Sequence, residues 1–163
     1  MTAVISSCGL YRYRLERDVA MAGPVYAFFG VNPSTADASI DDATVRKWTG
    51  FVKRWGGSRY LVGNVFAYRA TDVRELVNDP GPAFSLANQG HLRDIAAAAD
   101  VLVPCWGARS KVPRDLHHII DAAQHLLRQT GKPLMHMGLT ASGDPKHPLM
   151  LGYDTPLTEW KTG

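Results

Sequence analysis

Four short segments of this chain carry side chains that can hold and act on a small polar ligand. The first follows an apolar run and reads Asn32-Pro33-Ser34-Thr35. The amide of Asn32 can orient a water molecule or fix a ligand, and it can equally close a turn onto nearby backbone. Pro33 would stiffen this loop because its φ angle is already set. The hydroxyls of Ser34 and Thr35 can donate hydrogen bonds to an anion.

A second asparagine, Asn64, lies inside an otherwise apolar run, between Gly63 and Val65-Phe66. A buried amide is costly unless it is paired. Asn64 therefore either ties two strands together or reads the edge of a ligand. A nucleobase edge suits it, because the planar amide offers one donor and one acceptor.

The third segment is a histidine–proline pair, His147-Pro148, preceded by Lys146 and followed by Leu149-Met150-Leu151. Proline restricts the backbone of the residue before it, so the direction of His147 is fixed. The apolar trio is either core packing or a wedge that enters a stack of bases.

The fourth segment is Trp106-Gly107-Ala108-Arg109, with Lys111 and Arg114 close behind. Its small residues allow close approach of the backbone, and its basic run is either a phosphate site or a solvated charged face. The motifs GxxxxGK[ST], GxGxxG after a strand, and GxSxG do not occur, so P-loop, Rossmann and α/β-hydrolase chemistry lose their usual support.

The remaining histidines and the two cysteines do not form a metal motif. His117, His118 and His125 share one predicted helix without the spacing that a metal pair requires, and Cys8 and Cys105 are too few for a zinc ribbon or an all-cysteine cluster. We therefore expect no metal and no cofactor.

The elements that must position these segments alternate between strand and helix. Apolar runs predict strands at residues 24–31, 59–68, 100–107 and 133–139, and three-to-four spacing of apolar residues predicts helices at 41–55, 85–99 and 113–131. The alternating residues 11–15 predict a further strand at a sheet edge. This order predicts a single α/β domain over residues 1–163, a three-layer α/β/α sandwich around a mostly parallel four-stranded sheet. Ligands bind beyond the carboxyl ends of such strands, where all four segments fall.

Composition sets wide limits on partners and location. The net charge of +3 and the pI near 9.0 permit an anionic partner such as nucleic acid without requiring one. No apolar run has the length of a membrane span, and the amino-terminal residues do not resemble a signal peptide. Cys105 lies in an apolar run, as a buried thiol does in a reducing compartment. We therefore expect a cytoplasmic protein.

Together these motifs resemble the bacterial and phage family catalogued as domain of unknown function 1643. The resemblance covers nearly the whole chain and rests on RYRLERD, GVNPSTADASIDDATVRKW, VGNVFAYRATD, PCWGA and GDPKHPL. In the same order, GVNPS, VGNVF, VLVPCWGA and KHPLML are similar to motifs of the uracil-DNA glycosylase superfamily, with the Gly-x-Asn-Pro turn of its mismatch-specific branch. Two departures point away from uracil as the substrate. Asn32 stands where the most active uracil enzymes have aspartate, and Leu149 follows Pro148 where the superfamily usually has serine.

The superfamily resemblance implies a DNA glycosylase that hydrolyses the N-glycosidic bond of a flipped, modified pyrimidine. In that reading Asn32 and His147 are catalytic, because Asn32 places the attacking water and His147 stabilises the leaving base. The base-binding residues would be Asn64, Phe66, Asp42 and Arg69. The DNA-binding residues would be Ser34, Thr35, Trp106, Gly107, Arg109, Lys146 and Leu149, the last filling the vacated stack. The implied protein is a monomer that binds DNA without a cofactor.

Two other functions stay open at this point. The departures at Asn32 and Leu149 favour a non-catalytic protein that binds a modified base or nucleic acid. The modest net charge favours an enzyme acting on free nucleosides or nucleotides, since a small substrate needs no long basic track. Phage defence, DNA repair and the metabolism of hypermodified DNA all fit the sequence.

Overall fold

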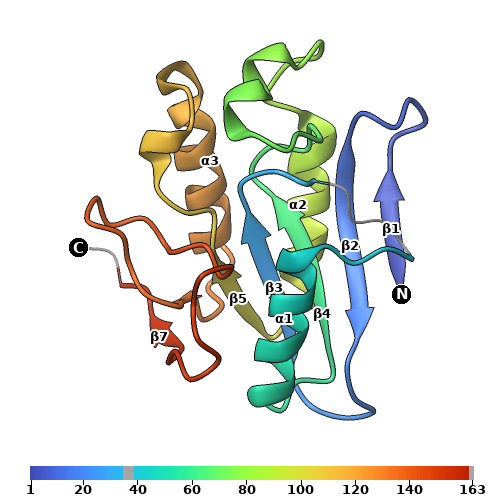
Figure 1. The fold of residues 1–163 in the computed structure, drawn as a ribbon, viewed down its shortest axis with the longest axis vertical. Coiled ribbons are helices and arrows are strands. Elements are labelled where there is room, and N and C mark those ends of the chain that lie inside the picture. The colour runs from blue at the N-terminus through green and yellow to red at the C-terminus, as the bar shows by residue number, and fades with distance from the viewer. Residues whose placement is uncertain (35–38, 162–163) are drawn as a thin grey trace.

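A five-stranded sheet forms the centre of the computed structural model, which describes residues 1–34 and 39–161 (Figure 1). The strand order is β1-β2-β4-β3-β5. The strands are β1 (Thr2–Ile5), β2 (Arg12–Asp18), β3 (Val25–Gly30), β4 (Arg59–Asn64) and β5 (Val101–Pro104). Strands β3, β4 and β5 run parallel, whereas β2 is antiparallel to both β1 and β4. The α/β class is confirmed, but the sheet is mixed and has five strands, which corrects the predicted mostly parallel four-stranded sheet.

The amino-terminal hairpin is the reason for the mixed sheet. The strand predicted at residues 11–15 is β2, and it lies inside the sheet instead of at its edge. Leu15 pairs with Val62 of β4 and is fully buried, while β1 covers the other side of β2. The half-exposed pattern of β1 is too short to predict from periodicity.

The strand predicted at residues 133–139 is mostly irregular. Its regular part is β6 (Met135–His136), which pairs with β7 (Thr158–Glu159) in a separate antiparallel sheet. A parallel bridge between Leu102 and Leu134 joins this segment to β5. Pro133 has no N–H to donate, and Gly138 has a φ angle of +107°, so neither end can continue a strand.

Three helices begin and end close to the predicted positions. They are α1 (Ala43–Arg54), α2 (Leu86–Ala98) and α3 (His117–Arg128), with short 3₁₀ turns η1 (Val73–Asn78), η2 (Arg109–Lys111) and η3 (Arg114–Leu116). Helix α1 starts at Asp42, whose carboxylate accepts a hydrogen bond from the Val45 backbone N–H at 2.9 Å. The predicted stop at Gly56 is also found, because Gly56 adopts a φ angle of +71°.

The helices cover both faces of the sheet (Figure 1). On one face Phe28 of β3 packs with Trp48 and Phe51 of α1. On the other face Phe29 joins residues of α2 and α3, such as Ile95. Successive side chains of a strand point to opposite faces, so one apolar strand serves both layers. Within the described residues, no helix is long and apolar enough to cross a membrane.

Candidate functional site

A small cavity of about 130 Å³ lies at the carboxyl ends of β3 and β4. Its lining includes five of the residues predicted from the sequence: Asn32, Ser34, Asp42, Asn64 and His147. It also includes residues that sequence reasoning missed, namely Arg12, Gly30, Val31, Thr44 and Trp48. The topology therefore brings together segments that are far apart in the chain, as expected for strands whose carboxyl ends share one edge.

Asn64 supplies a buried polar group to this cavity. Its side chain is only 2% exposed, and among the described residues Nδ2 has no hydrogen-bond partner. The facing residue is Gly30, where an added Cβ would lie 2.8 Å from Asn64 Oδ1. Asn88 of α2 fixes the backbone of Asn64, because its Nδ2 donates to the Asn64 carbonyl at 2.9 Å. An unpaired buried donor in a fixed place is the feature that a polar ligand would satisfy.

The Asn32 side chain binds backbone carbonyls and also lines the cavity, so a structural role and a ligand-binding role are compatible for this residue. Its Nδ2 donates to the Ala70 carbonyl at 2.7 Å and to the Pro33 carbonyl at 3.2 Å. These two bonds fix the amide plane, and Oδ1 remains the atom that can accept a hydrogen bond from a ligand or a water molecule.

Asp42 is the one carboxylate that lines the small cavity within the described part of the chain. One oxygen caps α1, and the other accepts a hydrogen bond from Ser34 Oγ at 2.5 Å. Arg69 braces the same loop from outside, since its Nε donates to the Ser34 carbonyl at 3.3 Å. Arg69 does not line the cavity, and its predicted contact with a base is not part of this arrangement.

His147 presents a neutral ring to the cavity. Its Nδ1 accepts a hydrogen bond from the Leu149 backbone N–H at 3.3 Å, so the proton of the neutral ring is on Nε2. Burial lowers the pKa of His147, the positive charge of Lys111 lowers this pKa further, and the Asp42 carboxylate acts in the opposite direction. His147 packs beside Gly107, where a Cβ would lie 3.6 Å from the His147 Cβ.

The lowered pKa of His147 predicts a loss of stability in mild acid. Below the ordinary histidine pKa of 6.5 the unfolded chain takes up a proton that the folded protein resists. The free energy of unfolding should therefore be level above that pH and fall as the pH decreases. Burial also lowers the pKa of His136, so this residue adds to the loss of stability in acid. Urea unfolding at several pH values should show a shallower fall for His147→Gln. The exposed His118→Gln serves as the control, and equal slopes in all three proteins would contradict the prediction.

Two predicted aromatic contacts belong to the core instead of the site. Phe66 is 2% exposed and Trp106 is 4% exposed, and both pack on the α2 and α3 face. The Trp106 ring meets the Trp160 ring edge to face at a centroid distance of 5.8 Å. Both side chains are packed inside the apolar layer between the sheet and the two helices. This position does not suit contact with a base or with DNA.

The other residues predicted to contact DNA lie at the surface or outside the residues that the structure describes. Lys146 is exposed, and Leu149 is 42% exposed beside His147. Thr35 lies outside the described residues. The predicted roles of Lys146 and Leu149 toward DNA stay predictions.

Arg109 is committed to ion pairs within the fold, which does not fit its expected role as a free phosphate ligand. Its Nε donates to Asp144 at 3.1 Å, and its guanidinium also donates to Asp121 at 3.0 Å. Asp144 is 3% exposed and also accepts from the Arg109 backbone N–H at 2.9 Å. These aspartates are distant in sequence, so the pairing could not be read from the basic run.

We expect Arg109→Ala to lower the free energy of unfolding by about 1–3 kcal/mol, because it removes the cation beside the buried Asp144 carboxylate. Lys111→Ala, at an exposed position in the same turn, should change it by less than about 0.5 kcal/mol. Urea denaturation of the two variants measures the difference, and equal stability would contradict it.

Comparison with known proteins gives one result. The model of the family described as "Protein of unknown function (DUF1643)" matches residues 12–149, and the chain belongs to this family. No curated protein and no solved structure matches the chain. These comparisons do not support the resemblance to the uracil-DNA glycosylase superfamily, and the glycosylase activity is therefore a proposal.

Proposed function

We propose that the protein hydrolyses the N-glycosidic bond of a pyrimidine-like base that is flipped out of DNA into the small cavity. The observation that carries this proposal is the Nδ2 of Asn64, which no described residue pairs with, in a cavity of about 130 Å³. A cavity of about 150 Å³ holds a benzene molecule, so the space suits one six-membered ring. A pyrimidine edge would supply the acceptor that Asn64 lacks.

The proposed reaction uses two polar groups that line the cavity, Asn32 and Asp42. Asn32 Oδ1 and the Asp42 carboxylate hold a water molecule, whose oxygen bonds to the sugar C1′ as the bond from C1′ to the base nitrogen breaks. The bonding electron pair leaves with the base, and the proton of the water passes to Asp42. The same carboxylate stabilises the oxocarbenium-like sugar of the transition state.

His147 would act on the leaving base. In the neutral ring, Nε2 is a donor that can bind a base oxygen as negative charge develops there. The lowered pKa keeps this donor neutral at pH 7. The exposed Leu149, directly after Pro148, would fill the space that the base leaves in the stack.

The test is mass spectrometry of free bases released when the purified protein meets ordinary and phage-modified genomic DNA. A base released by the wild type and by His118→Gln, but not by Asn32→Ala or His147→Gln, would support the proposal. Release that is equal in all four proteins, or no release by folded wild type from any DNA, would contradict it.

A second candidate is a non-catalytic protein that binds a flipped base. The hydrogen bond from Asn32 Nδ2 to Ala70 favours it, because this bond gives Asn32 a structural role that needs no reaction. Retention of base-modified DNA without release of a base would select this candidate.

A further inference from the structure

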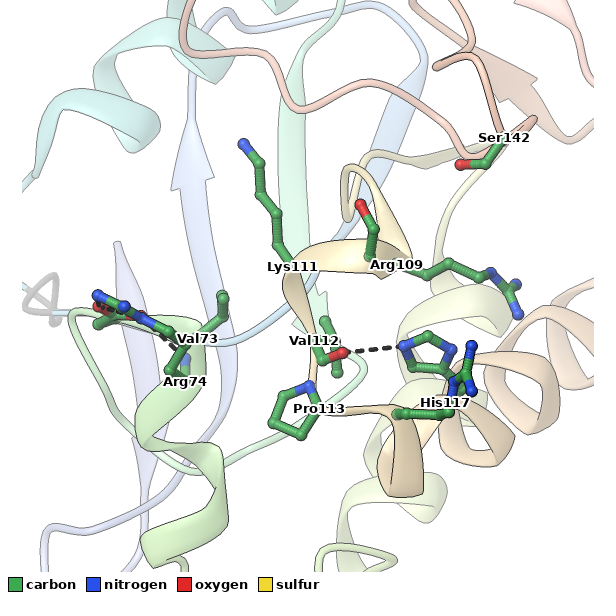
Figure 2. A pocket seen from close by; sticks show the side chains of 11 residues that line it. Val73, Arg74, Arg109, Lys111, Val112, Pro113, His117 and Ser142 are labelled. Atoms are coloured by element: carbon green, nitrogen blue, oxygen red, sulfur yellow. Dashed lines mark hydrogen bonds and ion pairs between the residues drawn. The ribbon is translucent and has the colours of Figure 1, made fainter.

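A second and larger cavity, of about 750 Å³, is lined in part by cationic side chains (Figure 2). Its walls come from the segment that follows β4, at Asp72 to Arg74, and from the η2 and η3 turns that follow β5. Val73, Val112 and Pro113 form an apolar part of the lining. The cationic residues of the lining are Arg74, Arg109, Lys111 and Arg114. We call this the basic cavity.

Two of these cations have no counterion in the described part of the chain. Arg74 pairs with Asp72 at 2.6 Å, and Arg109 pairs with aspartates. Within the described residues, the side chains of Lys111 and Arg114 form neither an ion pair nor a hydrogen bond with the protein, and both are exposed. Figure 2 shows the Lys111 side chain extending away from that of Arg109, so the ion pairs of Arg109 do not neutralise it.

Lys111 connects the basic cavity to the small cavity. Gly107, where an added Cβ would lie 3.6 Å from the His147 Cβ, comes two residues before η2, which carries Lys111, and His147 lines the small cavity. The positive charge of Lys111 also lowers the pKa of His147. An anion bound at Lys111 would therefore lie next to a ligand in the small cavity. In a nucleic acid, the groups adjacent to a base and its sugar are phosphates.

We infer that the basic cavity binds the phosphodiester backbone of a DNA strand next to the nucleotide whose base enters the small cavity. Lys111 would contact the phosphate nearest to that nucleotide, and Arg114 a neighbouring phosphate along the strand. The apolar wall of Val73, Val112 and Pro113 would lie against the sugars between them. The inference rests on the proposed function for the base, but not on catalysis, and it selects a polynucleotide over a free nucleoside as the substrate class.

The salt dependence of DNA binding tests this assignment. A single strand loses about 0.7 in the slope of log affinity against log salt for each phosphate contact. The double variant Lys111→Ala/Arg114→Ala should therefore reduce the slope for a labelled oligothymidylate of about 12 nucleotides by about 1.4. The control is Lys53→Ala/Arg54→Ala. It removes the same charge at the exposed far end of α1, and it should leave the slope unchanged.

Two further probes identify the source of the phosphate. The same oligothymidylate with uncharged methylphosphonate linkages should bind wild type and the double variant equally. Inorganic phosphate, at constant ionic strength, should not displace the charged strand. Displacement by inorganic phosphate would assign the cavity to a free anion and overturn the inference. An unchanged slope in the double variant, or no binding of the charged strand by wild type, would also overturn it.

These outcomes are separate from those of the base-release assay. A protein that binds the strand through Lys111 and Arg114 but releases no base refutes the proposed hydrolysis and leaves the backbone site in place. The opposite outcome is that the wild type releases a base, but the double variant binds DNA with the same salt slope as the wild type. This result would refute only the backbone site.

Discussion

Replacing Asp42 with asparagine should lower the rate of base release about 10²–10⁴-fold, the usual contribution of a general base, while the protein stays folded. The substitution removes the carboxylate that would take the proton of the attacking water. It keeps a good helix N-cap, since asparagine and aspartate cap helices about equally well. The hydroxyl of Ser34, which now donates to Asp42, can accept a hydrogen bond from the new amide. The measurement is the single-turnover rate of base release, with circular dichroism to confirm folding.

Asp42→Ala separates the two roles of this residue. It removes both the carboxylate and the cap, so it should lose activity to the same extent and also cost about 1 kcal/mol of stability. A variant Asp42→Asn with the wild-type rate would show that Asp42 only caps α1.

Replacing Asn64 with leucine should abolish base binding and raise the free energy of unfolding by about 1–3 kcal/mol. The buried Nδ2 of Asn64 has no partner in the described part of the chain, so the folded protein carries the desolvation cost of that donor. An apolar side chain of similar shape removes this cost and also removes the group that would recognise the ligand. Urea unfolding measures the stability, and equilibrium dialysis against the released base measures the binding.

Asn88→Leu is the matched control, and its effect should have the opposite sign. Nδ2 of Asn88 donates to the backbone carbonyls of Asn64 and Val65 at 2.9 and 3.2 Å. Leucine at this position leaves two buried acceptors without that donor, so stability should fall. If Asn64→Leu also lowered stability, the amide of Asn64 would be a structural group and not a binding group.

The central part of the fold is predictable because its signals are local. Residues 24–31 and 101–107 are continuous apolar runs, and they contain β3 and β5. The start of α1 at Asp42 and its end near Gly56 follow from cap chemistry that acts within one helical turn. In the run 59–68 the strand β4 ends at Asn64, although the backbone N–H groups of Val65 and Phe66 still donate to the carbonyls of Gly30 and Val31.

The order of the strands is not local, and it could not be predicted in the same way. Nothing in residues 11–15 indicates that they pair with β4 on one side and with β1 on the other. Alternation alone placed this strand at an edge. Strand β2 has a neighbour on both sides only because β1 pairs with it. The four residues of β1 are too few to predict a strand from their pattern.

The site shows the same difference between features that are local in sequence and features that depend on the fold. Asn32, Asn64 and His147 were identified by residue type at the end of a strand or beside proline, and they meet at one cavity. The ion pairs of Arg109 could not be predicted, because its partners, Asp121 and Asp144, come from other segments. Whether a side chain is free or paired is a property of the folded molecule.

The strand order also has a kinetic consequence. The hairpin of β1 and β2 closes a short loop, so it can form early. It joins the sheet where residues 15–18 of β2 pair with residues 59–62 of β4, and β3 and α1 lie between these two strands in the sequence. Closing that long loop costs entropy before its contacts form, which slows folding. Amides of β3 and β4 should therefore gain protection from hydrogen exchange before those that β2 shares with β4.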